Sequence, residues 1–152
     1  IYTGRGALCW LPDLRDWAQV CTSLLKPGGI LYFEESTPTV NIMDLEEGPD
    51  GPRLVAKYDL FEEGPISEVG EGSYAYPEWP GERVTHCWEY RYDTLFGAIT
   101  EAGLRVDLFS ERDELFFSAW PQLLEPSRTN YWKLKDGQVR IPLSFTLRAI
   151  KE

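Results

Sequence analysis

The chain has 152 residues, which is enough for one domain with a sizeable hydrophobic core. Acidic residues outnumber basic ones by 25 to 15, and the formal net charge of −10 argues against nucleic acid and against an anionic membrane surface, since both bind clustered Lys and Arg. The sequence has no apolar run long enough to span a membrane and no basic-then-apolar leader, so we expect a cytoplasmic protein.

The first predicted element is the end of a strand at Ile1 and Tyr2, which suggests that the sequence begins inside a domain. A glycine-containing loop, Thr3 to Gly6, follows it. A single Gly-x-Gly is a weak signal, so this loop is either a ligand-cradling loop or a tight strand-to-helix turn.

The second predicted element is an amphipathic helix from Leu14 to Leu25, capped by Asp13. Its apolar stripe has the spacing of a helix that packs one face on a core: Leu14, Trp17, Ala18, Cys21, Leu24 and Leu25. The LysProGlyGly segment ends the helix because proline cannot continue it and glycine reverses the chain. The apolar run Ile30 to Glu34 then predicts a strand covered on both faces.

The middle of the chain predicts a β-ribbon. Residues 36–51 are read as a loop, and two alternating segments, Arg53 to Phe61 and Val84 to Tyr92, are read as strands joined by a mobile tip. The second strand is expected to place an aromatic-rich stripe on one face, made of Val84, His86, Trp88, Tyr90 and Tyr92.

The last third predicts a helix capped by Asp93 and ended by Gly103, and then a strand from Leu104 to Leu108. A short helix broken at Pro121 is expected within residues 115–124. Residues 131–134 and 139–150 are expected to form a closing hairpin around the LysAspGlyGln turn.

Cysteine and aromatic content bear on the kind of site. Cys9, Cys21 and Cys87 have no paired metal-ligand spacing, so we expect reduced, mostly structural thiols and no metal site. Aromatic residues make up 14% of the chain, which is high for a small core and favours a planar or apolar ligand surface.

Four motifs in this order carry a family resemblance. They are TrpLeuProAspLeu at residues 10–14, LeuLeuLysProGlyGly at 24–29, IleLeuTyrPheGluGlu at 30–35 and AlaGlyLeuArgValAspLeuPheSerGlu at 102–111. Together they resemble the second half of a class I S-adenosylmethionine-dependent methyltransferase. The chain is most similar to the small-molecule branch that includes the quinone-biosynthesis methyltransferases, outside the segment Thr37 to Arg83.

The resemblance implies a partial, Rossmann-like α/β fold. Residues 1–152 would form a single domain, the C-terminal half of a methyltransferase, with a mixed sheet in the family's strand order 4-5-7-6, flanking helices, and an insertion at residues 37–92 that acts as a lid or β-ribbon. The family's glycine-rich first loop and its ribose-binding acidic residue belong to the other half. We therefore expect the open edge of the first strand to pair with a missing N-terminal half, a second copy or another chain.

The resemblance also implies which residues bind the cofactor. The loop after the first strand would contact the methionine end of S-adenosylmethionine through Thr3, Gly4, Arg5 and Gly6.

The candidates for the other roles come from residue type and position. The candidate general bases are His86 and Glu35, and the alternative for His86 is a hydrogen-bonded sheet residue. The acceptor-binding candidates are Trp10, Trp88 and Tyr90, and the alternative for the aromatic stripe is a packed ribbon face.

The sequence thus favours methyl transfer to a small, uncharged or cationic acceptor, competent only with the N-terminal half. A non-catalytic partner-binding or oligomerisation module stays open as an alternative. A nicotinamide-dependent enzyme also stays open, although no complete dinucleotide fingerprint supports it.

Overall fold

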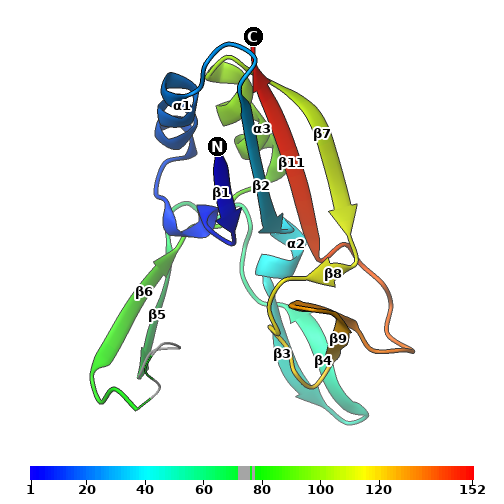
Figure 1. The fold of residues 1–152 in the computed structure, drawn as a ribbon. Helices are drawn as coiled ribbons and strands as arrows, with labels where there is room; N and C mark the ends of the chain where they lie inside the picture. Colours follow the sequence, from blue (N-terminus) through cyan, green and yellow to red (C-terminus); the bar gives the residue numbers. More distant parts are fainter. Residues whose placement is uncertain (72–75, 77) are drawn as a thin grey trace.

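A four-stranded sheet forms the centre of the computed structural model, which describes residues 1–71, 76 and 78–152. The strands lie in the order β1-β2-β11-β7 (Figure 1). They span Tyr2–Arg5, Ile30–Ser36, Ser144–Lys151 and Leu104–Arg112, respectively. β1 is parallel to β2, whereas β11 is antiparallel to both of its neighbours. The expected α/β fold with a mixed sheet is therefore confirmed.

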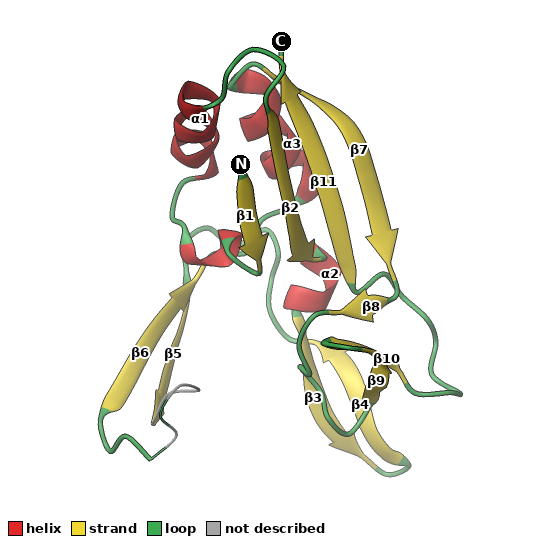
Figure 2. Cartoon of the chain, viewed as in Figure 1, coloured by secondary structure: helices red, strands yellow, loops and turns green. Residues whose placement is uncertain are grey.

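Two helices, α1 (Leu14–Leu24) and α3 (Tyr92–Glu101), cover one face of this sheet (Figure 2). Leu31 and Phe33 of β2 point into the core beneath the helices and are fully buried. Ile30 lies on the other face and is 44% exposed, so the prediction that β2 is covered on both faces is wrong for this end of the strand. Alternation along β2 sends successive side chains to opposite faces, and only one face carries helices.

The helix α1 has the predicted N-cap. The Asp13 carboxylate accepts hydrogen bonds from the backbone N–H groups of Arg15 and Asp16, at 2.7 and 3.1 Å. Gly28 has a φ of +75°, as the predicted chain reversal requires. Leu24 is 72% exposed and does not belong to the buried stripe, whereas the next residue, Leu25, is buried in the core.

The segment predicted to be a loop, residues 36–51, is mostly ordered secondary structure, and that prediction is wrong. Pro38–Asn41 form the short helix α2, and the Thr37 hydroxyl accepts a hydrogen bond from the Val40 N–H at 3.3 Å. Met43–Gly48 (β3) then pairs with Gly51–Ala56 (β4). The hairpin packs part of its apolar face against a second core, which the sequence pattern did not reveal.

The predicted single ribbon is two separate hairpins. The strand expected at residues 53–61 ends at Ala56, and it pairs with β3 rather than with the later strand. That later strand, β6 (Glu82–Cys87), ends well before Tyr92 and pairs with β5 (Ile66–Glu71). The predicted tip falls partly on residues 72–75 and 77, outside the described residues.

The aromatic stripe does not exist as a strand face, because the backbone leaves the ribbon after Cys87. The Trp88 N–H donates to the Cys9 carbonyl at 2.8 Å, which ties this segment to the loop after β1. The helix α3 begins at Tyr92, with Arg91 at the N-cap position, so Asp93 lies in the first turn and is not the cap. Gly103, with a φ of +83°, follows the end of the helix as predicted.

A second sheet has three strands, in the order β8-β10-β9. It consists of Glu114–Leu115, Tyr131–Leu134 and Leu124–Arg128. The predicted helix in residues 115–124 is therefore wrong, as is the predicted closing hairpin. β10 pairs with β8 and β9, whereas β11 pairs with β2 and β7, because the apolar residues of each strand face different cores.

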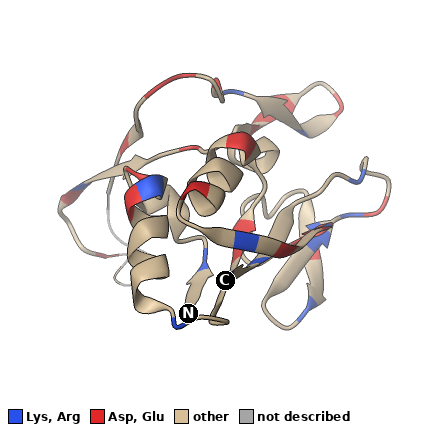
Figure 3. Cartoon of the chain, turned by 90° about the horizontal axis from the view of Figure 1, so that it is seen from above, with Lys and Arg blue, Asp and Glu red and all other residues tan. Residues whose placement is uncertain are grey.

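Charged residues are spread over separate elements, with Lys and Arg interspersed among Asp and Glu (Figure 3). Among the described residues no helix is both long and apolar enough to cross a membrane.

Candidate functional site

A hollow of about 460 Å³ lies where β1 and β2 end, at their carboxyl ends. Residues from four stretches of the chain line it: Arg5, Gly6, Cys9, Trp10, Ser36, Asn41, Glu89, Phe116 and Phe117. Ligands of open α/β sheets bind at the carboxyl ends of the strands, and this volume suits a small molecule. The hollow is therefore the candidate site.

Glu35 lies beside the hollow and lines a smaller cavity that shares Cys9, Ser36 and Asn41 with it. Its side chain is 6% exposed and stands near the end of β2. Its Oε1 accepts hydrogen bonds from the backbone N–H groups of Ala7 and Leu8, at 2.8 and 3.1 Å. Burial nevertheless raises the pKa of Glu35 to about 7, and the carboxyl of Glu89 adds to this increase. Glu35 therefore exchanges protons in the neutral pH range, as a general base requires.

Glu89 is a second carboxyl at the same site. Burial raises its pKa to about 7, against a hydrogen bond from the Asn41 side chain that lowers it. Among the described residues, its Oε2 is a buried atom with no hydrogen-bond partner. Asn41 is held in turn by the Ser36 hydroxyl, which donates to Asn41 Oδ1 at 2.5 Å. A buried carboxylate oxygen without a donor is costly, so this atom suits a ligand that brings one.

Aromatic rings form the opposite side of the hollow. Trp10 and Phe117 are 54% and 44% exposed. Phe116 packs against Gly6, whose φ is +65° and where an added Cβ would lie 3.1 Å from the Phe116 ring. Gly6 therefore combines a left-handed backbone with a close approach, and both favour glycine at this position.

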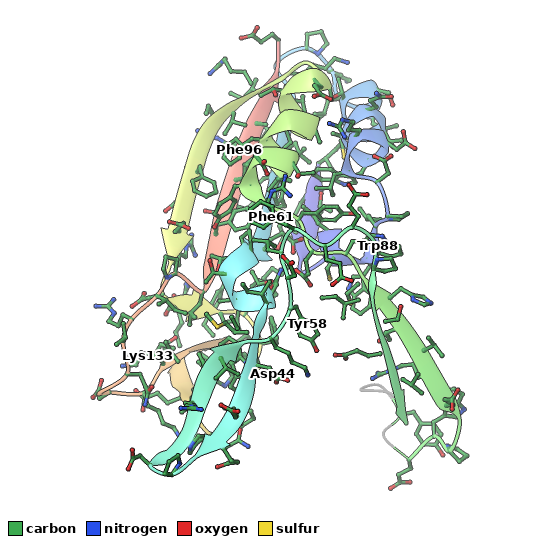
Figure 4. All side chains as sticks on the ribbon, turned by 180° about the vertical axis from the view of Figure 1, so that it is seen from behind. Asp44, Tyr58, Phe61, Trp88, Phe96 and Lys133 are labelled. Carbon is green, nitrogen blue, oxygen red and sulfur yellow. The ribbon has the colours of Figure 1, made fainter. Side chains whose placement is uncertain are left out.

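A smaller cavity of about 30 Å³ adjoins the hollow and shares Cys9, Ser36 and Asn41 with it. Its further lining comes from the start of α3, the end of β2 and the segment after β6: Leu8, Glu35, Pro38, Trp88, Tyr90, Tyr92, Leu95 and Phe145. Trp88 stands where the β5–β6 hairpin meets the body of the protein (Figure 4). The hydroxyl of Tyr90 donates to the Leu11 carbonyl.

Two cysteines also reach this region. Cys9 lines both cavities, and burial raises its pKa to about 12, with the nearby Cys87 thiol as the next cause. Both thiols are free. Because the thiolate is the reactive form, Cys9 stays protonated and unreactive at neutral pH.

The structure places most of the predicted site residues around these two cavities, since Arg5, Gly6 and Trp10 line the hollow and Glu35, Trp88 and Tyr90 line the smaller cavity. Thr3 to Arg5 belong to β1 itself rather than to a loop, which corrects the predicted boundary.

Three of the predicted residues, Arg5, Gly4 and Thr3, have distinct local environments. The Arg5 guanidinium lies over the rings of Phe116 and Tyr131, at 5.9 and 5.5 Å from their centroids. Gly4 has a φ of +95°, and the Thr3 hydroxyl is buried without a partner among the described residues.

His86 does not lie with the other candidates. It is exposed on β6, and its Nδ1 is hydrogen-bonded to the Ser67 hydroxyl across the hairpin at 2.8 Å. It lines neither cavity. This geometry favours the alternative reading of His86 as a hydrogen-bonded sheet residue.

Sequence reasoning missed Glu89, Asn41, Phe116 and Phe117. Glu89 was assigned to the side opposite the aromatic stripe, because the strand was extended through it. The PhePhe pair was assigned to a helix. Among the described residues no group of His, Cys, Asp or Glu is arranged to hold a metal ion.

No known family pattern matches the sequence, and no curated protein matches it. The fold, in contrast, is similar to solved structures. A Listeria monocytogenes protein described as an S-adenosylmethionine-dependent methyltransferase is 14% identical, with a TM-score of 0.63, over 99% of this chain and 61% of that one. A methyltransferase of the same description from Mesorhizobium loti is 17% identical, with a TM-score of 0.57 and the same two coverages.

A third structure, an S-adenosylmethionine-dependent methyltransferase from Clostridium acetobutylicum, is 10% identical, with a TM-score of 0.52, over 99% of this chain and 57% of that one. The chain thus spans about six tenths of the length of the structures it matches. Over almost all of its own length, it has the fold of these S-adenosylmethionine-dependent methyltransferases.

Proposed function

We propose that this chain is the C-terminal half of a cytoplasmic S-adenosylmethionine-dependent methyltransferase of the small-molecule branch. It transfers a methyl group to a small, uncharged or cationic acceptor and is competent only together with an N-terminal half. The observation that carries this proposal is the hollow at the carboxyl ends of β1 and β2, with the buried carboxyl of Glu35 in the cavity that adjoins it, in a chain with a methyltransferase fold.

The residues after β1 fit one end of the cofactor. Gly4 and Gly6 take left-handed conformations, so the backbone there can approach a ligand closely. The hollow beside them is lined by aromatic rings and by Glu89, both of which attract a sulfonium cation. The residues that would hold the methionine end are Thr3, Gly4, Arg5 and Gly6. When bound, the cofactor supplies an activated methyl group on a positively charged sulfur.

The chemistry left to the chain is alignment and proton transfer. Methyl transfer is an in-line displacement, so an enzyme gains most by holding the acceptor in position and excluding water. Trp10 and Phe117 wall the hollow, and the hairpins within residues 37–92 act as a lid over the acceptor. Trp88 and Tyr90 hold the acceptor from the adjoining cavity. Glu35 is the general base for an acceptor that loses a proton.

The edge of β1 is the proposed contact with the missing half. β1 is the outermost strand of the sheet, and Tyr2 is 62% exposed at its start. An unpaired strand edge with apolar side chains readily adds another strand. A missing N-terminal half is the partner we favour, because the chain spans only 61% of the first two similar structures.

Calorimetry of the full-length protein with S-adenosylmethionine tests this proposal. We expect saturable heat release, weakened at least tenfold by Gly6→Ala, because the substitution strains the loop and pushes on Phe116. Gly137→Ala is the matched control, since Gly137 also has a positive φ, of +89°, but lies in the turn after β10 with nothing near it. A folded full-length protein that releases no heat would count decisively against the proposal.

The alternative is a non-catalytic module that binds a partner or a second copy through the β1 edge. The exposure of Ile1 and Tyr2 at that edge is the observation that favours it. This alternative predicts a stable complex without cofactor binding. Sedimentation analysis alongside the calorimetry separates the two functions.

A further inference from the structure

Two carboxylate oxygens at the site lack a donor from the protein. Both hydrogen bonds to Glu35 fall on Oε1, so among the described residues Oε2 receives none, although the side chain is 6% exposed and lines the smaller cavity. Glu89 Oε2 is buried and unpartnered, and Glu89 lines the hollow. The carboxyl of Glu89 contributes to the raised pKa of Glu35. Each of these two oxygen atoms can accept a hydrogen bond from a ligand.

Among the described residues, no basic side chain forms an ion pair with Glu35 or Glu89. Within the described lining of the two cavities, Arg5 is the one basic residue. Its guanidinium lies over the rings of Phe116 and Tyr131. Glu34, the neighbouring acid on β2, lines neither cavity; its Oε2 accepts a hydrogen bond from the Tyr131 hydroxyl at 2.8 Å, and its buried Oε1 has no partner among the described residues. When Glu35 and Glu89 are ionised, their negative charge therefore has no cationic partner among the described residues, and a cationic ligand can provide one.

The rest of the hollow suits an organic cation rather than a metal ion. Trp10, Phe116 and Phe117 present ring surfaces to a volume of about 460 Å³. Aromatic faces attract ammonium groups, and the volume accommodates an apolar body attached to such a group. A bare metal ion would find only these carboxyls, and no metal-holding group exists among the described residues.

We propose that the methyl acceptor is a primary or secondary amine, bound as its ammonium ion between Glu89, which lines the aromatic hollow, and Glu35, which lines the adjoining cavity. This inference rests on the proposed methyltransferase function and narrows its acceptor. The ammonium group donates to the free Oε2 atoms, and one carboxylate then takes an N–H proton. The nitrogen lone pair forms the new N–C bond while the methyl C–S bond breaks and its electron pair stays on sulfur.

The geometry also defines what the site rejects. An alcohol of the same shape brings one donor and no charge, so it gains less from two carboxylates. A carboxylic acid brings a negative charge next to Glu35 and Glu89, and binding it costs free energy. The expected order of affinity is amine, then alcohol, then carboxylate.

A binding experiment without cofactor tests this order. The probes are 2-phenylethylamine, 2-phenylethanol and 3-phenylpropanoate, titrated into the full-length protein and followed by tryptophan fluorescence. We expect the amine to bind at least tenfold more tightly than the alcohol. Glu89→Gln should bring the two within about twofold, since it removes one charge with little change of shape. The exposed Asp136→Asn, in the turn after β10, is the matched control and should leave the preference unchanged.

Equal binding of amine and alcohol, a preference for the carboxylate, absent amine binding, or a preference that survives Glu89→Gln would each overturn the proposal. A thermal melt verifies that the variant is folded, and Glu35→Gln serves as the second variant if it is not. These outcomes do not depend on S-adenosylmethionine. Heat release with the cofactor together with failure of the amine test would reject the acceptor class and leave the methyltransferase function standing.

Discussion

Glu35→Gln should make the stability of the protein much less dependent on pH. Glu35 is 6% exposed, and burial raises its pKa from the ordinary 4.5 to about 7. Glutamine has nearly the same shape, and its Oε1 can still accept from the N–H groups of Ala7 and Leu8. The substitution therefore removes the titration and keeps the hydrogen bonds.

Proton linkage gives the direction and the size of this dependence of stability on pH. At a pH below about 4 the carboxyl is protonated in both states and contributes no pH dependence. As the pH rises, the unfolded state ionises first, so the folded state binds more protons and stability falls until the pH passes about 7. The difference between the two pKa values corresponds to about 3 kcal/mol of stability lost across this window.

Urea unfolding at about pH 4 and about pH 8, followed by tryptophan fluorescence, measures this loss. We expect the wild-type protein to lose about 3 kcal/mol more than Glu35→Gln between these conditions. The exposed Glu47→Gln should lose as much as wild type. If Glu35→Gln and wild type lose the same free energy to within about 1 kcal/mol, burial does not perturb Glu35 in the way proposed.

Three further substitutions test the fold. Asp13→Ala removes the cap of α1 and should cost about 1 kcal/mol, with faster amide hydrogen exchange at Arg15 and Asp16 as its local signature. Phe33→Ala, in the fully buried centre of the core, should cost about 3–5 kcal/mol in urea unfolding, and a loss below about 1 kcal/mol would contradict the assigned burial. Lys151→Met should cost about 1–2 kcal/mol by thermal melting, because the Lys151 ammonium donates to the carbonyls of Thr22 and Leu25, both at 2.8 Å, and an unchanged melting temperature would show that these bonds contribute nothing.

Local rules in the sequence predicted the central unit of the fold well. Asp13 before an amphipathic segment, and glycines after it, define both ends of α1 through hydrogen bonds and backbone preferences that act within a few residues. The apolar run after Gly29 forms β2, and Glu35 stands near its end as predicted. These features need no knowledge of distant partners, which is why one sequence sufficed.

Only some residues of the candidate site could be predicted from the sequence. Glu35, Arg5, Gly6 and Trp10 come from segments whose place in the fold the motifs define. Glu89 reaches the site because the backbone after Cys87 leaves the hairpin and bonds to the Cys9 carbonyl. This change in the direction of the backbone depends on a contact between residues far apart in the sequence, and no local sequence pattern predicts it.

By itself the sequence determined the capped helix, the strand that follows it, the acidic character and the resemblance to a methyltransferase, because each depends on residue type and short spacing. The tertiary structure decided the rest. It separated the expected ribbon into two hairpins, placed His86 on an exposed surface, and brought Glu89 and Phe116 to the hollow beside β2. The physical reason is that alternation predicts a strand but not its partner, and the partner is chosen by which apolar faces can share a core.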